Sequence, residues 1–270
     1  MTVAAGTVEE PGVRAAALEL RGVTQRFGGV VALDALELTV PSGSIFALIG
    51  PNGAGKTTVF NLVTGVYRPT SGSLWFDGER ISGRRPHQVT RAGIARTFQN
   101  IRLFENMTAL ENVQVGADAR HKSSVVGAAL GLPRFRREER DGNQRGAELL
   151  DFVGIARVAG EPAKALSYGD QRRLEIARAL ATRPQLMLLD EPAAGMNPVE
   201  KDGLMQLIRR IRDTGVTIFL IEHDMGLVMQ ASDRLAALDF GQKIADDVPS
   251  AVRSDLRVIE AYLGADADAS

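Results

Sequence analysis

Residues 50–58 read Gly50-Pro51-Asn52-Gly53-Ala54-Gly55-Lys56-Thr57-Thr58, between an apolar run at 45–49 and a helix-like segment at 59–63. A strand, a glycine-rich turn and a helix in this order form the context that a phosphate-binding P-loop requires. The glycines let backbone N–H groups converge on a phosphate, and the helix adds the positive end of its dipole. Lys56 is expected to reach the β- and γ-phosphates, and the Thr57 hydroxyl to bind Mg²⁺. The stretch therefore predicts nucleotide binding through the residues Asn52, Gly53, Ala54, Gly55, Lys56, Thr57 and Thr58.

The composition is that of a soluble globular protein. The 270 residues are 44% apolar and 24% charged, with a formal net charge of −1. The length allows one large α/β domain or two modest ones, and the near-neutral charge gives no overall attraction to nucleic acid. There is no cysteine. Disulfides, thiol catalysis and cysteine-bound zinc are therefore excluded, which fits a reducing cytoplasm.

No membrane-spanning or targeting segment is predicted. No apolar run approaches the roughly 20 residues that a spanning helix needs. Residues 1–11 include two glutamates and have no apolar core, so a secretory signal is not expected there. We expect 1–15 and 265–270 to be flexible tails. A function at a membrane would then require other subunits as anchors.

Apolar periodicity predicts an α/β protein. Strands are expected around the P-loop at 18–20, 36–40 and 73–76. Later in the chain, buried strands are expected at 186–189, 216–221 and 234–238, and helices at 199–213 and 224–231. Apolar strands that alternate with helices predict a mostly parallel sheet covered on both faces.

The middle of the chain, from about 110 to 166, has a helical pattern instead. Helices are expected at 113–119, 127–132 and 147–153. Between the last two lies a charged connector at 134–140, and mixed-sign runs of this kind are more often a solvated helix face than a binding site. This part is predicted to be a helical insertion into the α/β core.

Hydrolysis of a bound nucleotide needs a carboxylate near Mg²⁺ and a group that orients the attacking water. Asp190 and Glu191 follow the buried strand 186–189, at the end of a strand where ligands bind in open α/β sheets. Asp190 is expected to hold Mg²⁺, directly or through water, and Glu191 to act as general base. Without a P-loop upstream, two solvated acids at a strand end would be the simpler interpretation.

Three further features are ambiguous when each is taken alone. Gln99 would be an ordinary loop glutamine, and His223, after the strand 218–221, a structural histidine or a contact to the γ-phosphate. Ser167 fits the N-cap of the helix around 174–180, with Asp170 in its first turn. His87 and His121 have no constellation around them.

Together these motifs resemble an ATP-binding-cassette (ABC) ATPase, and the resemblance covers the chain from about Leu18 to Leu263. Its parts stand in the order of that family: the P-loop at 50–57, Gln99 of the Q-loop, the signature at 166–171, the strand and acids at 186–191, the D-loop at 194–198 and the switch His223. Three positions depart from the commonest form. They are Tyr168 and Asp170 in the signature and Asn197 in the D-loop.

The departures point to one subfamily. The stretches 96–104, 166–180, 194–198, 221–225 and 258–264 look like the ATPase subunits of branched-chain amino acid importers. The resemblance implies a P-loop NTPase of ABC type, with a mostly parallel central sheet, an N-terminal antiparallel β subdomain and a helical insertion. One ABC domain is expected over 16–264, with a RecA-like core at about 16–105 and 172–264 and a helical subdomain at about 106–171.

The family's mechanism implies two subunits that face head to tail and trap two ATP molecules between them. Ser167 and Gly169 would then bind the γ-phosphate held by the partner subunit, because a helix N-terminus is an anion-binding surface. The resemblance assigns catalysis to Glu191, His223, Gln99 and Lys56, and Mg²⁺ to Thr57, Gln99 and Asp190. Phe27 is expected to stack on adenine, although a buried core phenylalanine is an alternative.

The implied cofactors are ATP and Mg²⁺, and the implied partners are membrane permease subunits, a second ATPase subunit and, indirectly, a periplasmic or extracellular substrate-binding protein. No nucleic acid is expected. The chain would work as a peripheral subunit at the cytoplasmic face of the membrane. Residues 101–107 are expected to dock a cytoplasmic helix of a permease, or else to cover the insertion's own core.

Alternatives remain open at this stage. Similar ATPases serve importers for urea or other amides and exporters of lipopolysaccharide, and an ATPase subunit does not touch the cargo. A soluble ABC ATPase of translation or DNA repair is disfavoured by the single cassette and the lack of heptads. A regulator with little turnover is disfavoured by Glu191 in the base position. The resemblance implies two different ATPases serving two different permeases, so a heterodimer is expected, although this chain alone shows only one complete set of motifs.

Overall fold

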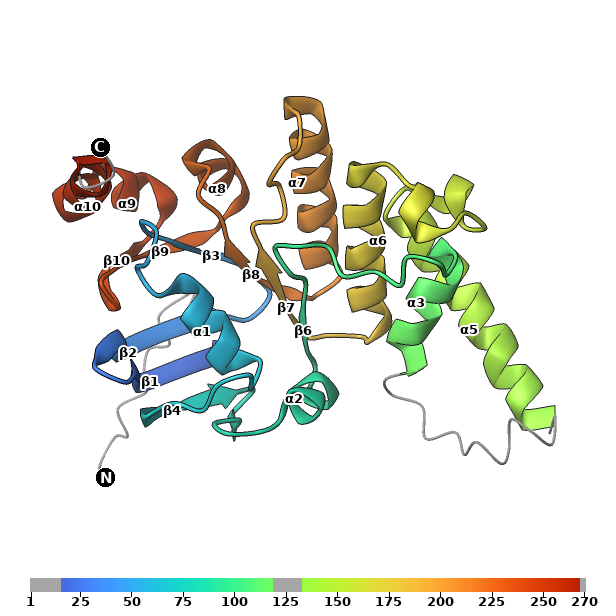
Figure 1. Cartoon of the computed structure of the whole chain (residues 1–270), viewed down its shortest axis with the longest axis horizontal. Coiled ribbons are helices and arrows are strands. Elements are labelled where there is room, and N and C mark those ends of the chain that lie inside the picture. Colours follow the sequence, from blue (N-terminus) through green and yellow to red (C-terminus); the bar gives the residue numbers. More distant parts are fainter. Residues whose placement is uncertain (1–15, 119–132, 268–270) are drawn as a thin grey trace, which may run out of the picture.

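The computed structural model describes residues 16–118 and 133–267, and two sheets and a group of helices make up this part of the chain (Figure 1). The expected helix at 127–132 and the tail at 1–15 lie outside the described residues. Within the described ranges, no helix combines the length and the apolar character that crossing a membrane requires.

The first sheet is antiparallel and has the strand order β2-β1-β4-β5. Its strands are β1 (Ala16–Phe27), β2 (Val30–Pro41), β4 (Ser71–Phe76) and β5 (Glu79–Arg80). Leu36, Leu38 and Val40 of β2 are buried while the residues between them are exposed, which is the period-two pattern of a half-buried strand. The expected antiparallel β subdomain is confirmed.

The second sheet has the order β10-β9-β3-β8-β7-β6. Its strands are β3 (Ile45–Ile49), β6 (Ile94–Arg96), β7 (Leu186–Asp190), β8 (Thr217–Ile221), β9 (Arg234–Asp239) and β10 (Gln242–Asp247). All neighbouring pairs are parallel except β9 and β10. Every residue of β3, β7 and β8 is buried, because helices or strands cover both faces of the sheet. The predicted mostly parallel sheet is confirmed.

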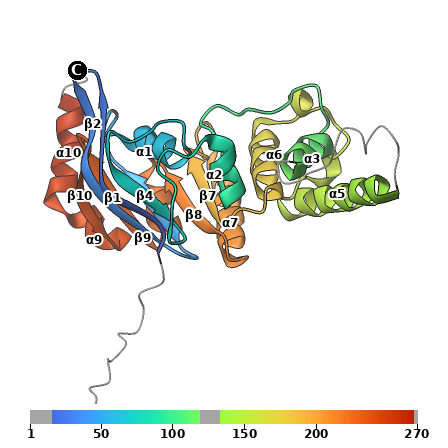
Figure 2. The same ribbon diagram turned by 90° about the horizontal axis from the view of Figure 1, so that it is seen from below.

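One helix fills the space between the two sheets. The helix α1 (Lys56–Val63) buries Val59, Phe60, Leu62 and Val63 in a core shared with both sheets. Figure 2 shows α1 between the central strands and the antiparallel sheet. The ring of Phe219 lies edge-on to Phe46 and Phe60, with centroids 5.6 and 4.9 Å apart. This cluster fixes the helix that follows the P-loop against β3 and β8.

Four helices bury residues in the core on the opposite face of the central sheet. They are α7 (Pro198–Asp213), α8 (Met225–Ala231), α9 (Pro249–Ser254) and α10 (Leu256–Ala267). The helix α2 (Pro86–Ala92) instead buries Val89 in the core that contains α1. α10 ends at Ala267, so residues 265–267 of the expected tail belong to a helix. Asn197 caps α7 through a capping box with Glu200, a role that aspartate and asparagine serve equally well.

A helical insertion extends from the β6–β7 edge of the central sheet (Figure 2). It contains α3 (Ala109–Asp118), α5 (Pro133–Phe152), α6 (Tyr168–Ala181) and two short 3-10 helices, η1 (Ala156–Val158) and η2 (Ala163–Ala165). The expected boundary of this subdomain at 171/172 falls inside α6. The prediction of a connector at 134–140 is wrong, because these residues form the first half of α5.

Candidate nucleotide-binding and hydrolysis site

The P-loop leaves β3 at Gly50 and ends at Lys56, the first residue of α1. Gly53 and Gly55 have φ values of 82° and 105°, a left-handed conformation that side chains with a Cβ rarely adopt. A Cβ on Gly50 would lie 2.2 Å from the carbonyl oxygen of Leu238, so only glycine fits there. These positions explain the glycine pattern of the loop.

Lys56 turns back over the P-loop. Its Nζ donates hydrogen bonds to the carbonyl oxygens of Gly50 at 2.6 Å and Pro51 at 2.9 Å. Burial lowers the pKa of Lys56, and the nearby charges of Glu191 and Asp190 oppose this shift. The ammonium is thus held beside the loop, within the electrostatic reach of both predicted acids.

The predicted base, glutamine and histidine lie together at the carboxyl ends of β7 and β8. The backbone N–H of Glu191 donates to the carbonyl of Ile221 at 2.9 Å, which ties the loop after β7 to β8. Gln99 Nε2 donates to Glu191 Oε2 at 2.9 Å. His223 Nδ1 lies 3.7 Å from the same oxygen, and its side chain is 62% exposed. Two of the residues expected to act in catalysis, Gln99 and His223, therefore converge on the carboxylate of a third, Glu191.

Asp190 has a partner that the sequence analysis missed. Arg96 on β6 forms an ion pair with it, with 2.7 Å between Nη2 and Oδ2, and both side chains are more than 90% buried. The same guanidinium donates to Asn61 Oδ1 of α1 at 2.7 Å. Arg96 thus joins the predicted Mg²⁺ ligand to the helix of the P-loop. A sequence signal existed, since Arg96 begins the stretch 96–104, which was used only as a subfamily feature.

Two more residues near the site were not singled out from the sequence. The buried carboxylate of Glu222 accepts a hydrogen bond from the Ala193 N–H at 3.0 Å, and burial raises its pKa. Tyr262 of α10 accepts one from the Gly50 N–H at 3.0 Å. Glu222 therefore holds the loop that leads into the D-loop, and the C-terminal helix contacts the start of the P-loop. Only tertiary structure brings these groups to the site.

The signature stretch lies in the helical insertion. Ser167 caps α6, and its Oγ accepts the Asp170 N–H at 3.2 Å, as predicted. Asp170, which departs from the commonest signature, forms an ion pair through its carboxylate with Arg157 at 2.6 Å. Both views place α6 outside β7 and α1 on the opposite side of that strand (Figures 1 and 2). This arrangement agrees with the expectation that Ser167 and Gly169 serve a nucleotide other than the one on their own P-loop.

Phe27 ends β1 and is 42% exposed, so it is not a core residue. Its ring meets that of Tyr67 edge-on, with centroids 5.1 Å apart. The alternative of a buried phenylalanine is therefore wrong, while adenine stacking stays a prediction. An exposed ring that is already braced by a second aromatic ring is suited to stack on a base.

Replacing Phe27 with alanine should raise the KM for ATP about tenfold and leave kcat unchanged. Stacking on a base is worth roughly 1–3 kcal/mol, and the ring is distant from the reacting phosphate. Steady-state ATP titrations measure both constants. The exposed Leu256 of α10 provides a control, since its replacement by alanine should change neither. A fall in kcat with an unchanged KM would contradict adenine stacking at Phe27.

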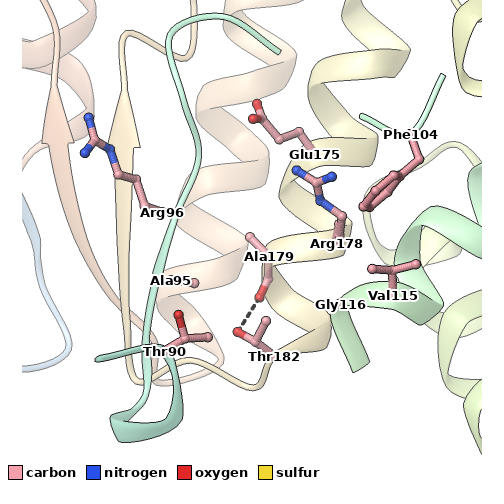
Figure 3. A pocket seen from close by; sticks show the side chains of 10 residues that line it. All are labelled: Thr90, Ala95, Arg96, Phe104, Val115, Gly116, Glu175, Arg178, Ala179 and Thr182. Carbon is pink, nitrogen blue, oxygen red and sulfur yellow. Dashed lines mark hydrogen bonds between the residues drawn. The ribbon is translucent and has the colours of Figure 1, made fainter. Parts of the chain in front are cut away.

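A cavity of about 320 Å³ opens between the central sheet and the helical insertion (Figure 3). Its lining residues are Thr90, Ala95, Arg96, Phe104, Val115, Gly116, Glu175, Arg178, Ala179 and Thr182. The guanidinium of Arg178 lies 5.8 Å from the ring centroid of the exposed Phe104. Of the residues at 101–107 that were expected to dock a permease helix, Phe104 lines this cavity.

Known proteins are similar to this chain over most of its length. The "ABC transporter" family model matches residues 33–194, and the "Branched-chain amino acid ATP-binding cassette transporter" model matches 242–268. The high-affinity branched-chain amino acid transport ATP-binding protein BraF of Pseudomonas aeruginosa is 47% identical over 92% of this chain and 97% of the relative.

Two solved structures are also similar. One is an ATP-binding cassette of an ABC transporter in its ADP conformation, with a TM-score of 0.81 and 30% identity over 93% of this chain and 99% of that one. The other is a dimeric bacterial ABC transporter cassette, with a TM-score of 0.72 and 25% identity over 86% and 98%. The chain therefore belongs to the ATP-binding subunits of ABC transporters, within the branched-chain amino acid type.

Proposed function

We propose that this chain hydrolyses ATP to power the import of leucine, isoleucine and valine, with Glu191 as the general base. The observation that carries the proposal is the convergence of Gln99 and His223 on Glu191 Oε2, at 2.9 and 3.7 Å, beside a complete P-loop. A carboxylate with one oxygen near an amide and an imidazole can take a proton from a water that these groups orient.

The P-loop supports a role in holding the phosphates of ATP. Its left-handed glycines and the start of α1 offer N–H groups, and Lys56 is already inside the loop. With ATP bound, phosphate oxygens would replace the carbonyl oxygens of Gly50 and Pro51 as the acceptors of hydrogen bonds from Lys56. Phosphate oxygens are charged, so they bind an ammonium more strongly than neutral carbonyl oxygens do. Lys56 then stabilises the charge that develops during phosphoryl transfer.

Mg²⁺ fits the residues present. Among the described residues no three His, Asp or Glu side chains form a metal cage, and Mg²⁺ in ATPase sites is held by one or two carboxylates together with substrate phosphates and water. Thr57, Asp190 and Gln99 would hold it here, and it would supply charge neutralisation at the phosphates. Arg96 orients Asp190 for this role through its ion pair.

A second ATPase subunit completes the proposed site. The dimeric cassette structure supports this proposal, as does the position of α6 on the far side of β7 from the P-loop. Ser167 and Gly169 would bind the γ-phosphate of the partner's ATP. ATP then favours the closed dimer and hydrolysis removes that preference, which is how the cycle performs work. The partner is either a second copy of this chain or a related ATPase.

Membrane permease subunits are the proposed output partners, with this chain peripheral at the cytoplasmic face. The cavity between the central sheet and the insertion supports docking of a permease helix, because Phe104, Val115 and Ala179 offer apolar contacts beside the charge of Arg178. A substrate-binding protein outside the membrane would act only through the permease. Of residues 101–107, Phe104 would contribute from inside the cavity.

The proposed cargo rests on the relatives, since no residue of an ATPase subunit meets it. Its test uses cells that lack this chain and cells complemented with the wild type or with Lys56→Ala. Uptake of labelled leucine at low concentration should fall at least about tenfold without the chain, and only the wild type should restore it. Uptake of labelled urea serves as the control and should not change. Unaltered leucine uptake would contradict the proposed cargo, and loss of urea uptake instead would favour an amide importer.

A further inference from the structure

The first turns of α6 contain an ion pair whose two side chains are both buried. Arg172 and Glu175 are 0% and 1% exposed, with 2.8 Å between Nη1 and Oε2. Burial raises the pKa of Glu175, and Arg172 opposes the shift. The desolvation of two charges offsets most of their attraction, so two apolar residues of similar size in place of Arg172 and Glu175 would stabilise the fold equally. Stability alone does not explain this pair.

The pair holds the backbone of the Q-loop. Arg172 donates to the carbonyl oxygen of Phe98 at 2.7 Å and to that of Gln99 at 2.8 Å. Glu175 Oε1 accepts the N–H of Phe98 at 3.2 Å. The Nε of Arg172 has no hydrogen-bond partner among the described residues. The guanidinium therefore keeps its contacts with the Q-loop carbonyls although one of its buried donors is unpaired, which is unfavourable. The side chain of Gln99 then reaches Glu191.

The same pair borders the cavity of Figure 3 and the signature stretch. Glu175 and Arg178 line the cavity from α6, and Phe104 lies beside Arg178. Arg172 also donates to the hydroxyl of Tyr168 at 3.2 Å. One buried pair therefore contacts the cavity wall, the start of α6 and the residue that touches the catalytic carboxylate.

The inference rests on the function proposed above. We propose that Arg172 is a positioning residue for Gln99, and that the Arg172–Glu175 pair couples the docking of a permease helix in the cavity to the contact between Gln99 and Glu191. The position of the Gln99 backbone determines whether its Nε2 can contact Glu191 Oε2. That hydrogen bond of 2.9 Å is lost when the two atoms move apart by about 1 Å. A helix docked in the cavity would press on the α6 wall that carries Glu175. Arg172 would pass that displacement to the Gln99 carbonyl.

The test is a double-mutant cycle in the full chain isolated with its membrane subunits. The variant Arg172→Met with Glu175→Leu replaces the pair by apolar residues of similar size, which keeps the fold. It should lower kcat about tenfold with the KM for ATP changed less than twofold. In a Gln99→Ala background the same replacement should change kcat less than twofold, because the residue that it positions is gone. An equal loss in both backgrounds, or no loss in either, overturns the proposal.

Three further variants separate positioning from stability. Glu175→Gln keeps the acceptor for the Phe98 N–H and should retain kcat within threefold. Arg172→Lys keeps a buried cation but has no planar fork to span two carbonyls, so kcat should fall by at least threefold. Lys243→Met breaks an exposed pair of the same spacing, Lys243 with Asp246, and should leave turnover unchanged. Full turnover in Arg172→Lys, or an equal loss in Lys243→Met, contradicts a positioning role.

The link to the cavity has its own measurement. Turnover of the chain alone is compared with turnover in the membrane complex, for the wild type and for Arg172→Met with Glu175→Leu. Turnover in the complex, divided by turnover of the chain alone, should exceed about three in the wild type and approach one in the variant. A wild-type ratio of one, or the wild-type ratio retained in the variant, overturns the link. Failure of the proposed base is detected separately, because Glu191→Gln would then keep its turnover.

Discussion

Replacing Glu191 with glutamine should lower ATP turnover at least about a hundredfold and leave ATP affinity within a factor of two or three. Glutamine keeps the size of the side chain and its contact with Gln99, but it cannot take a proton from water. A hundredfold loss corresponds to about 2.7 kcal/mol of transition-state stabilisation. Steady-state hydrolysis and equilibrium binding of ATP measure the two quantities separately.

The same variant should accumulate as a dimer in ATP and Mg²⁺, because the closed state no longer decays by hydrolysis. Size-exclusion chromatography with and without ATP detects this. Glu260→Gln, at an exposed glutamate of α10, is the matched control and should hydrolyse ATP and elute like the wild type. Wild-type turnover in Glu191→Gln would show that another group removes the proton. Lost turnover with no ATP-dependent dimer would contradict the trapped sandwich.

The second large effect is expected at Arg96. Arg96→Met should destabilise the fold by about 3–5 kcal/mol, because it leaves the Asp190 carboxylate buried without its partner. For a domain of this size each kcal/mol shifts Tm by about 2–4 °C, so the melting temperature should fall by about 10 °C. The orientation of Asp190 should be lost as well, and the Mg²⁺ concentration needed for half-maximal turnover should rise about tenfold. Thermal denaturation and Mg²⁺ titration of ATPase activity measure the two effects.

Arg234→Met is the matched control for Arg96. Arg234 also pairs with an aspartate at 2.7 Å, but it is 44% exposed and lies in the strand β9 at the other end of the sheet. Exposed pairs contribute about 0–1 kcal/mol, so this variant should melt within a few degrees of the wild type. If Arg96→Met melted like Arg234→Met and kept its Mg²⁺ dependence, the ion pair would have neither of the two roles given to it.

Much of the site was predictable because its motifs are local. The P-loop needs glycines at fixed positions between a strand and a helix, and both flanks form as expected. Asp190 and Glu191 follow four apolar residues that identify a buried strand without reference to the rest of the chain. Ser167 carries its own helix-capping signal. Parallel strands bring their carboxyl ends to one edge of the sheet, so the proximity of Glu191 and His223 follows from the strand prediction. The place of Gln99 does not, because it follows the short strand β6, which was not predicted, and its role was expected only from the family resemblance.

The missed residues depend on contacts between distant parts of the chain. Arg96 and Asp190 are 94 positions apart, and Tyr262 lies 212 positions from Gly50. Arg172 reads as a solvated charge at the start of an amphipathic helix, yet it is fully buried because the Q-loop covers it. No periodicity distinguishes such a charge from an exposed one. A partner for each buried charge can be named only when the fold is known.

One local prediction failed for a different reason. Residues 134–140 carry a run of mixed charges between two predicted helices, and this run was predicted to be a charged connector. Arginine and glutamate are nevertheless good helix formers, and the run contains neither glycine nor proline, so it continues as α5. Intrinsic propensity was the better guide there. The departure at Asn197 shows the reverse case, where a local capping rule accounts for the residue completely.

The central claim is that hydrolysis at Glu191 drives the uptake of branched-chain amino acids. The most direct measurement isolates the membrane complex through a tag on this chain, reconstitutes it in vesicles with the substrate-binding protein, and follows labelled leucine and released phosphate together. With wild-type chain, leucine should accumulate only when ATP is present on the side of this subunit. With Glu191→Gln, accumulation and phosphate release should both be lost. Leucine accumulation at the wild-type rate in Glu191→Gln vesicles would contradict the account.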